Sequence, residues 1–159
     1  MESLRSFEDL EVWKTGRELR KDISVLVKTF PHQKKYRLVD QMIRCARSVT
    51  NNVAEGFGRY HYQENIQYCR QSRGSLFELK DHLIVALDEA YIDRENFGSY
   101  NIKIDTVLAL LNGYINHLKQ KKKPTTTDNK ESTTDNKRQI TDNKEPVTDN
   151  NNHSLQSFI

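Results

Sequence analysis

Four segments within residues 1–123 repeat their apolar side chains every three or four positions, and short polar breaks separate them. Such spacing puts the apolar side chains of each segment on one face of an α-helix. We predict helices over about residues 8–29, from 35 to the glycines at 56 and 58, over 63–91, and from 99 to Pro124. Helices joined by short loops alternate in direction when neighbours pack. The predicted fold is therefore all-α, an antiparallel up-down-up-down four-helix bundle.

Several residues predict where these helices begin, end or approach one another. Ser6 precedes two acidic residues and is a candidate cap of the first helix, and Ser99 is a candidate cap of the fourth. Gly56 and Gly58 follow the second apolar stripe, so we expect them to end that helix in the left-handed conformation. Gly74 lies inside the third segment, where it predicts close approach by a neighbouring helix or a ligand.

Residues 124–159 form a different kind of segment, which we predict to be a disordered tail. The tetrapeptide Thr-Asp-Asn-Lys begins at residues 127, 134 and 141, and Thr-Asp-Asn follows at 148. Seven-residue spacing is typical of coiled coils, but these repeats contain no apolar seam. The whole chain has 25 Lys plus Arg and 22 Asp plus Glu, of which the tail contains 4 and 6. Residues 1–123 therefore have a net charge of +5, which suits anionic partners.

The sequence lacks the patterns that usually accompany catalysis or metal binding. It contains no glycine-rich phosphate loop, no paired-cysteine zinc pattern and no His-Glu zinc helix, and its five histidines show no i, i+4 spacing on one helix. Cys45 and Cys69 both fall on predicted core faces, so a disulfide scaffold is not expected. We therefore expect no enzyme activity, no cofactor, no metal site and no small-molecule substrate. The absence of a long apolar run predicts a cytoplasmic protein without a membrane segment.

Three polar residues at the edges of the second and third stripes form a predicted cluster. Arg73 lies at the margin of its apolar stripe, where a charged group needs a partner. Asn52 and Glu55 lie near the end of the preceding helix. We predict a semi-buried Asn52–Glu55–Arg73 cluster, joined by Ser72 or Ser75, that fixes the register of the two helices. A ligand-binding or catalytic role for this cluster is the alternative.

Basic residues on the predicted helix surfaces are candidates for nucleic-acid contact. Beside one of them, Tyr60, His61 and Tyr62 provide stacking surface of the kind that suits single-stranded RNA or DNA. The alternative is that these residues are ordinary solvated positions, because helix surfaces are normally charged and helix ends favour lysine. The candidates are Arg37, Arg44, Arg47, Arg59, Arg70, Lys119, Lys121, Lys122 and Lys123.

Three separated stretches resemble a known family. They are residues 7–14 (FEDLEVWK), 52–59 (NVAEGFGR) and 73–79 (RGSLFEL). In this order they resemble the four-helix-bundle proteins encoded within intervening sequences of bacterial 23S ribosomal RNA genes, over about residues 5–120. Thr50 stands where that family often has proline. The resemblance implies a homopentamer without known enzymatic activity. A related branch, the accessory protein of diversity-generating retroelements, is a basic pentamer that associates with reverse transcriptase and nucleic acid.

Residues and resemblance together predict a non-enzymatic, oligomeric bundle that binds RNA, DNA or a ribonucleoprotein through its basic residues. The alternative is a protein–protein interaction scaffold whose charged faces are merely solvated. The number of aromatic side chains exceeds what one small bundle core readily encloses, so we expect some to line a subunit interface. The candidates for that interface are Trp13, Phe57, Tyr60, Tyr62, Phe77 and Tyr100.

Overall fold

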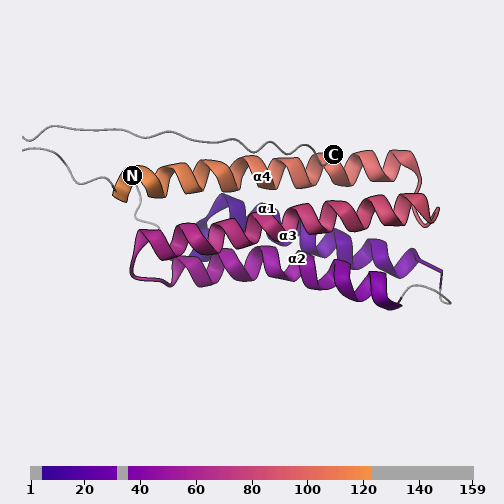
Figure 1. Ribbon diagram of the computed structural model, residues 1–159, viewed down its shortest axis with the longest axis horizontal. Coiled ribbons are helices and arrows are strands. Elements are labelled where there is room, and N and C mark those ends of the chain that lie inside the picture. Colours follow the sequence, from indigo (N-terminus) through magenta and orange to yellow (C-terminus); the bar gives the residue numbers. More distant parts are fainter. Residues whose placement is uncertain (1–4, 32–35, 123–159) are drawn as a thin grey trace, which may run out of the picture. The chain divides into compact units, whose positions relative to one another are not determined.

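A computed structural model describes residues 5–31 and 36–122 of the chain (Figure 1). The chain divides into two units, Met1–Thr125 and Thr126–Ile159. The second unit lies outside the described residues. The predicted disorder of residues 124–159 and the candidate Lys123 therefore remain predictions.

The first unit is an antiparallel four-helix bundle. Its elements are the 3₁₀ turn η1 (Phe7–Asp9), α1 (Glu11–Leu26), the 3₁₀ turn η2 (Val27–Thr29), α2 (Tyr36–Phe57), α3 (Tyr62–Asp88) and α4 (Arg94–Lys122). Helix α1 packs against α2 and α4, and α3 packs against the same two helices. In Figure 1, α3 lies between α2 and α4 while α1 lies behind them. The predicted fold class is confirmed.

Apolar side chains from all four helices fill the bundle interior. Ile23 of α1, Met42 of α2, Leu79 of α3 and Leu111 of α4 have no exposed surface. The predicted stripes supply most of this core, but Ile102 is 67% exposed. It lies two residues from Ile104, which turns the two side chains about 200° apart on the helix. Because Ile104 is buried, Ile102 must face outward.

Neither of the two predicted caps lies at the start of its α-helix. At the start, the Glu8 N–H donates to Ser6 Oγ (3.2 Å) and the Ser6 N–H donates to Asp9 Oδ2 (3.0 Å). These paired bonds form a capping box for the 3₁₀ turn η1, whereas α1 begins after Leu10 without a side-chain cap. Helix α4 instead begins before Ser99, because Asp93 Oδ1 accepts a hydrogen bond from the Asn96 N–H at 2.7 Å. The carboxylate satisfies a free N–H of the first turn, and the predicted Ser99 cap is wrong.

The glycines act differently from the predictions. None of the described glycines has a positive φ, so Gly56 and Gly58 do not end α2 in the left-handed conformation. Gly56 lies inside α2, where a Cβ would stand 2.8 Å from Asn65 Oδ1 and 2.9 Å from Tyr68 Cβ. At Gly74 a Cβ would meet no heavy atom within 4 Å. The close helix approach predicted at Gly74 is therefore found at Gly56, where α2 meets α3.

This contrast predicts opposite effects for one substitution at two sites. Gly56→Ala is expected to lower the free energy of unfolding by about 1–2 kcal/mol, because overpacking against α3 exceeds the gain in helix propensity. Gly74→Ala is expected to raise it by about 0.5–1 kcal/mol, because the helix gains propensity without a clash. Urea denaturation of both variants measures these changes. A stabilised Gly56→Ala protein would contradict the close packing.

Candidate nucleic-acid interface

Small neutral side chains fix the register between α2 and α3. Asn52 Nδ2 donates to the Ser48 carbonyl oxygen at 2.9 Å and to Ser48 Oγ at 3.0 Å. From α3, Ser75 Oγ donates to Ser48 Oγ (2.8 Å) and the buried Ser72 Oγ donates to the Val49 carbonyl oxygen (2.9 Å). Ser72 and Ser75 therefore make the polar contact expected between the two helices, whereas both hydrogen bonds of Asn52 stay within α2.

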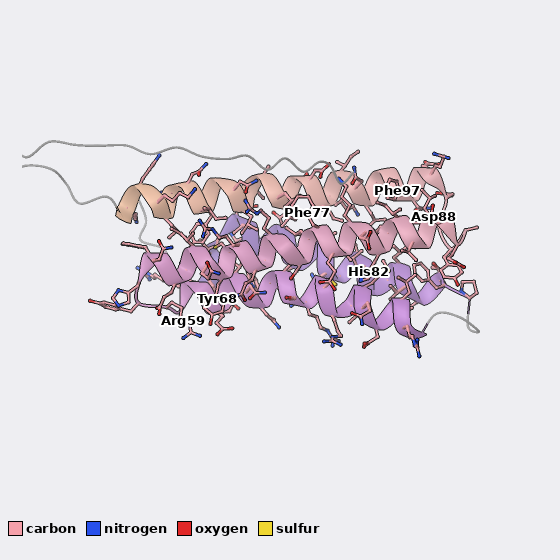
Figure 2. All side chains as sticks on the ribbon, viewed as in Figure 1. Arg59, Tyr68, Phe77, His82, Asp88 and Phe97 are labelled. Carbon is pink, nitrogen blue, oxygen red and sulfur yellow. The ribbon has the colours of Figure 1, made fainter. Side chains whose placement is uncertain are left out.

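The charged part of the predicted Asn52–Glu55–Arg73 cluster is corrected by the structure. Arg59 Nη2 donates to Glu55 Oε1 and to the Tyr68 hydroxyl, each at 2.5 Å. Arg73 is exposed on α3. Glu55 pairs with Arg59, four residues later in the chain, which is nearer than Arg73 on α3. Figure 2 shows Arg59 beside Tyr68, and the guanidinium lies 4.8 Å from the ring centroid.

This Glu55–Arg59–Tyr68 contact predicts a stability change in acid. Hydrogen bonds from Tyr68 and then Arg59 lower the pKa of Glu55 below its ordinary value of 4.5. A lowered folded-state pKa adds stability above pH 4.5, and this stability is lost as the pH falls through the lower value. We expect wild type to lose more stability below pH 4.5 than Glu55→Gln does. Thermal unfolding at a series of pH values measures this difference. If the melting temperatures of the two proteins fall equally as the pH is lowered below 4.5, this contact is contradicted.

The end of the bundle near Arg59 also carries exposed aromatic surface. Tyr60 is 93% exposed, and its ring meets that of His61 edge-on with centroids 4.9 Å apart. Tyr62, the first residue of α3, is 44% exposed. These rings are available for stacking, whereas the guanidinium of Arg59 is already engaged by Glu55.

The remaining basic candidates are spread over three helices. On α2, Arg37, Arg44 and Arg47 are exposed, and Arg44 Nη1 lies 4.0 Å from Asp40 Oδ2. Arg70 is exposed on α3. Lys119 and Lys121 are exposed near the end of α4, and Lys122 is its last residue. The candidates thus do not gather into one surface.

One predicted candidate, Arg47, does meet other cations in a groove between α1 and α2. This α1–α2 groove encloses about 540 Å³ and is lined by Arg20, Lys21, Ser24, Val25, Arg47 and Asn51. Three lining residues are cationic and Asn51 offers an amide, whereas the Ser24 hydroxyl donates to a backbone carbonyl oxygen. Glu18, which is outside the lining, accepts a hydrogen bond from Lys21 Nζ at 2.9 Å. Such a set of donors matches the oxygens of a phosphate group.

Thr50 couples Arg20 of α1 to α2. The Arg20 Nη1 donates to Thr50 Oγ1 at 3.0 Å, and Thr50 Oγ1 donates to the Arg47 carbonyl oxygen at 3.1 Å. Thr50 is only 1% exposed, and its hydrogen bond with Arg20 is partly buried. On α1, Ser24 Oγ donates to the Arg20 carbonyl oxygen at 2.9 Å. The Arg20 guanidinium is therefore held in position before any ligand arrives.

Comparison with known proteins identifies the family. A sequence model of the 23S rRNA-intervening sequence protein family matches residues 8–113. The chain belongs to this family. The matched stretch includes all of α1, α2 and α3, and with them every residue that lines the α1–α2 groove.

A solved structure shares the fold of this family member. It is a protein of unknown function from the S23 ribosomal protein family of Bacteroides thetaiotaomicron, with 23% sequence identity and a TM-score of 0.62. The alignment covers 65% of this chain and 97% of the solved one. The search among curated proteins gives no match.

Sequence reasoning missed two groups of residues that the structure brings together. Arg20 and Lys21 were not among the candidates, because only the packing of α1 beside Thr50 places them next to Arg47. Cys45, Glu78 and His82 were also missed, although the i, i+4 spacing of the last two was a readable signal. In the part of the chain that the structure describes, no helix has the length and apolar character needed to cross a membrane.

Proposed function

We propose that this protein is a non-enzymatic, cytoplasmic, oligomeric bundle that binds RNA or DNA, or a ribonucleoprotein, and that the α1–α2 groove holds phosphate groups. The observation that carries this proposal is the convergence of Arg20, Lys21 and Arg47 from two helices into one groove. No lining residue of that groove is acidic. The other basic candidates on α2, α3 and α4 lie outside the groove.

The binding mechanism is electrostatic. Each Arg or Lys that neutralises a phosphate releases counterions from the nucleic acid, so affinity falls as salt rises. Thr50 holds the Arg20 guanidinium in place, which reduces the entropy lost when a phosphate binds. Contacts to phosphate position a strand without reading its bases. Tyr60 and Tyr62 add stacking surface, which likewise tolerates any base.

RNA is the first probe to test, because the family description refers to 23S rRNA. Fluorescence anisotropy of labelled single-stranded RNA and DNA, titrated with the full chain at several salt concentrations, measures the binding. We expect saturable binding at low salt that weakens steadily as salt increases. An absence of binding at the lowest salt concentration contradicts the proposed function.

Oligomerisation is a separate part of the proposal. Among the aromatic residues expected at a subunit interface, Trp13 packs within the monomer against Phe7, with centroids 5.1 Å apart, and the Tyr100 hydroxyl donates to the Asp22 carbonyl oxygen at 3.4 Å. Phe57 is half-buried, whereas Phe77 is 56% exposed. Four large apolar side chains are exposed on α3 and α4, which supports self-association. They are Phe77, Ile84, Val85 and Ile102.

Light scattering of the purified full chain tests this part. We propose the homopentamer that the family resemblance implies, so the expected mass is about five times that of one chain. Phe77→Asp is expected to lower the measured mass, because it places a charge on the exposed apolar surface. A monomer at micromolar concentration contradicts the pentamer but leaves the nucleic-acid proposal to its own test.

A second candidate function is a protein–protein interaction scaffold. The observation that favours it is the same exposed apolar set on α3 and α4, which lies apart from the α1–α2 groove. The two functions differ in their response to salt. A scaffold that binds a polypeptide through apolar contacts keeps its affinity when salt increases, whereas phosphate binding does not.

A further inference from the structure

Three metal-ligating side chains of different chemistry converge where α2 packs against α3. The Cys45 Sγ, one carboxylate oxygen of Glu78 and one ring nitrogen of His82 all lie within 4.8 Å of one another. Glu78 and His82 are four residues apart, so they share one face of α3. Figure 2 shows His82 on the side of α3 that faces α2. Helix α2 therefore supplies one donor atom, and α3 supplies two.

The imidazole of His82 has a nitrogen without a partner. Its Nε2 is buried and makes no hydrogen bond among the described residues. The nearest carboxylate atom, Glu78 Oε1, lies 3.8 Å away, which is too long for a hydrogen bond. Buried polar atoms in folded proteins are nearly always satisfied, so this nitrogen calls for an explanation.

A metal ion bound between the three groups would explain the unpaired nitrogen of His82. Zinc binds sulfur at about 2.3 Å and nitrogen or oxygen at about 2.0–2.2 Å in tetrahedral geometry. A nitrogen and an oxygen bound in this way lie about 3.3–3.6 Å apart, a few tenths of an ångström less than the 3.8 Å between His82 Nε2 and Glu78 Oε1. The donor atoms now lie up to 4.8 Å apart, so side-chain movements of about 1 Å would bring them to the separations of a tetrahedral site.

The helices around this cluster are held together independently of it. One turn away, Ser75 of α3 bonds to Ser48 of α2, and Ser72 bonds to the Val49 carbonyl oxygen. The two helix backbones therefore hold the donor atoms in position before a metal binds. Glu78 is exposed, so ions and water can reach the cluster from that side.

We propose that Cys45, Glu78 and His82 bind one divalent transition-metal ion per chain, with Zn²⁺ the best chemical match. Thiolate and imidazole ligands favour zinc over Mg²⁺ or Ca²⁺, which prefer oxygen. Three protein ligands leave a fourth position for water. Binding replaces the proton on Cys45 Sγ, and that proton passes to solvent. The ion ties α2 to α3.

The site is tested with the full chain purified without an affinity tag. Competition against a metal-binding dye measures the Zn²⁺ affinity and stoichiometry, and Co²⁺ substitution gives an absorption spectrum. We expect one ion per chain and a thiolate-to-cobalt charge-transfer band. Cys45→Ser and His82→Gln are each expected to weaken Zn²⁺ binding at least tenfold, and Cys45→Ser to remove the band.

Cys69 provides the matched control. It is also buried on α3, but its Sγ contacts Asn65 Oδ1 at 3.5 Å and belongs to no metal-ligating group among the described residues. Cys69→Ser is expected to keep the affinity and the band. Circular dichroism checks that Cys45→Ser folds. If it does not fold, the Zn²⁺ affinity of Glu78→Gln tests the site instead, because Glu78 is exposed. Equal effects of the Cys45 and Cys69 substitutions, unchanged affinity in Glu78→Gln, or a cobalt spectrum without the thiolate band would overturn the proposal.

Discussion

Replacing Phe30 with alanine is expected to lower the free energy of unfolding by about 3–5 kcal/mol, among the largest losses that a core truncation causes. Phe30 follows η2 at the end of the first helical segment and is only 2% exposed. Its ring packs on that of Tyr91, with centroids 5.4 Å apart, in the turn that joins α3 to α4. Truncation leaves a cavity where the end of η2 packs against the α3–α4 turn.

Urea denaturation with constant m-values measures this loss. Val25, near the end of α1, is 62% exposed, so Val25→Ala serves as a control at the same end of the bundle. We expect the control to change stability by no more than about 0.5 kcal/mol. A loss below about 1 kcal/mol in Phe30→Ala would show that this end of the core is not packed as described.

The second large effect is expected in binding. The triple variant Arg20→Gln, Lys21→Gln, Arg47→Gln should bind single-stranded RNA about 100-fold more weakly at low salt. This figure follows if each charge contributes about 1 kcal/mol, because 1.4 kcal/mol corresponds to a tenfold change in affinity. Anisotropy titrations of the variant and wild type measure the ratio.

A matched variant removes the same charge elsewhere. Arg70→Gln, Lys119→Gln, Lys121→Gln eliminates three exposed cations that lie outside the α1–α2 groove. We expect it to weaken binding by less than tenfold. Arg20 also bonds to the buried Thr50, so thermal unfolding of the groove variant must show that the bundle stays folded. Equal weakening by both variants would contradict a specific role for the groove.

The bundle itself was predictable because apolar periodicity is a local property of each segment. The stripes that contain Met42, Leu79 and Leu111 are buried as predicted. Periodicity does not say which neighbour a surface position meets. The sequence predicted a close approach at Gly74 and a helix end at Gly56, yet of these two only Gly56 lies against another helix.

The candidate sites depended on contacts between helices, and here the sequence was less informative. Arg47 was predicted as a candidate, but Arg20 became one only through Thr50, thirty residues away. The predicted pairing of Glu55 with Arg73 overlooked Arg59, which lies one helical turn beyond Glu55 in the chain. The Arg20–Thr50 contact is set by how α1 packs against α2, which single-segment patterns do not encode. The Glu55–Arg59 pair is a local i, i+4 contact that the sequence does contain.

The salt dependence of RNA binding tests the central claim most directly, namely that the α1–α2 groove holds phosphates. The slope of log affinity against log salt falls by about 0.7 for each single-strand phosphate contact removed. The groove variant is therefore expected to have a slope smaller by about 2 than wild type, while the variant at Arg70, Lys119 and Lys121 keeps most of its slope. A groove variant with the wild-type slope would contradict the claim.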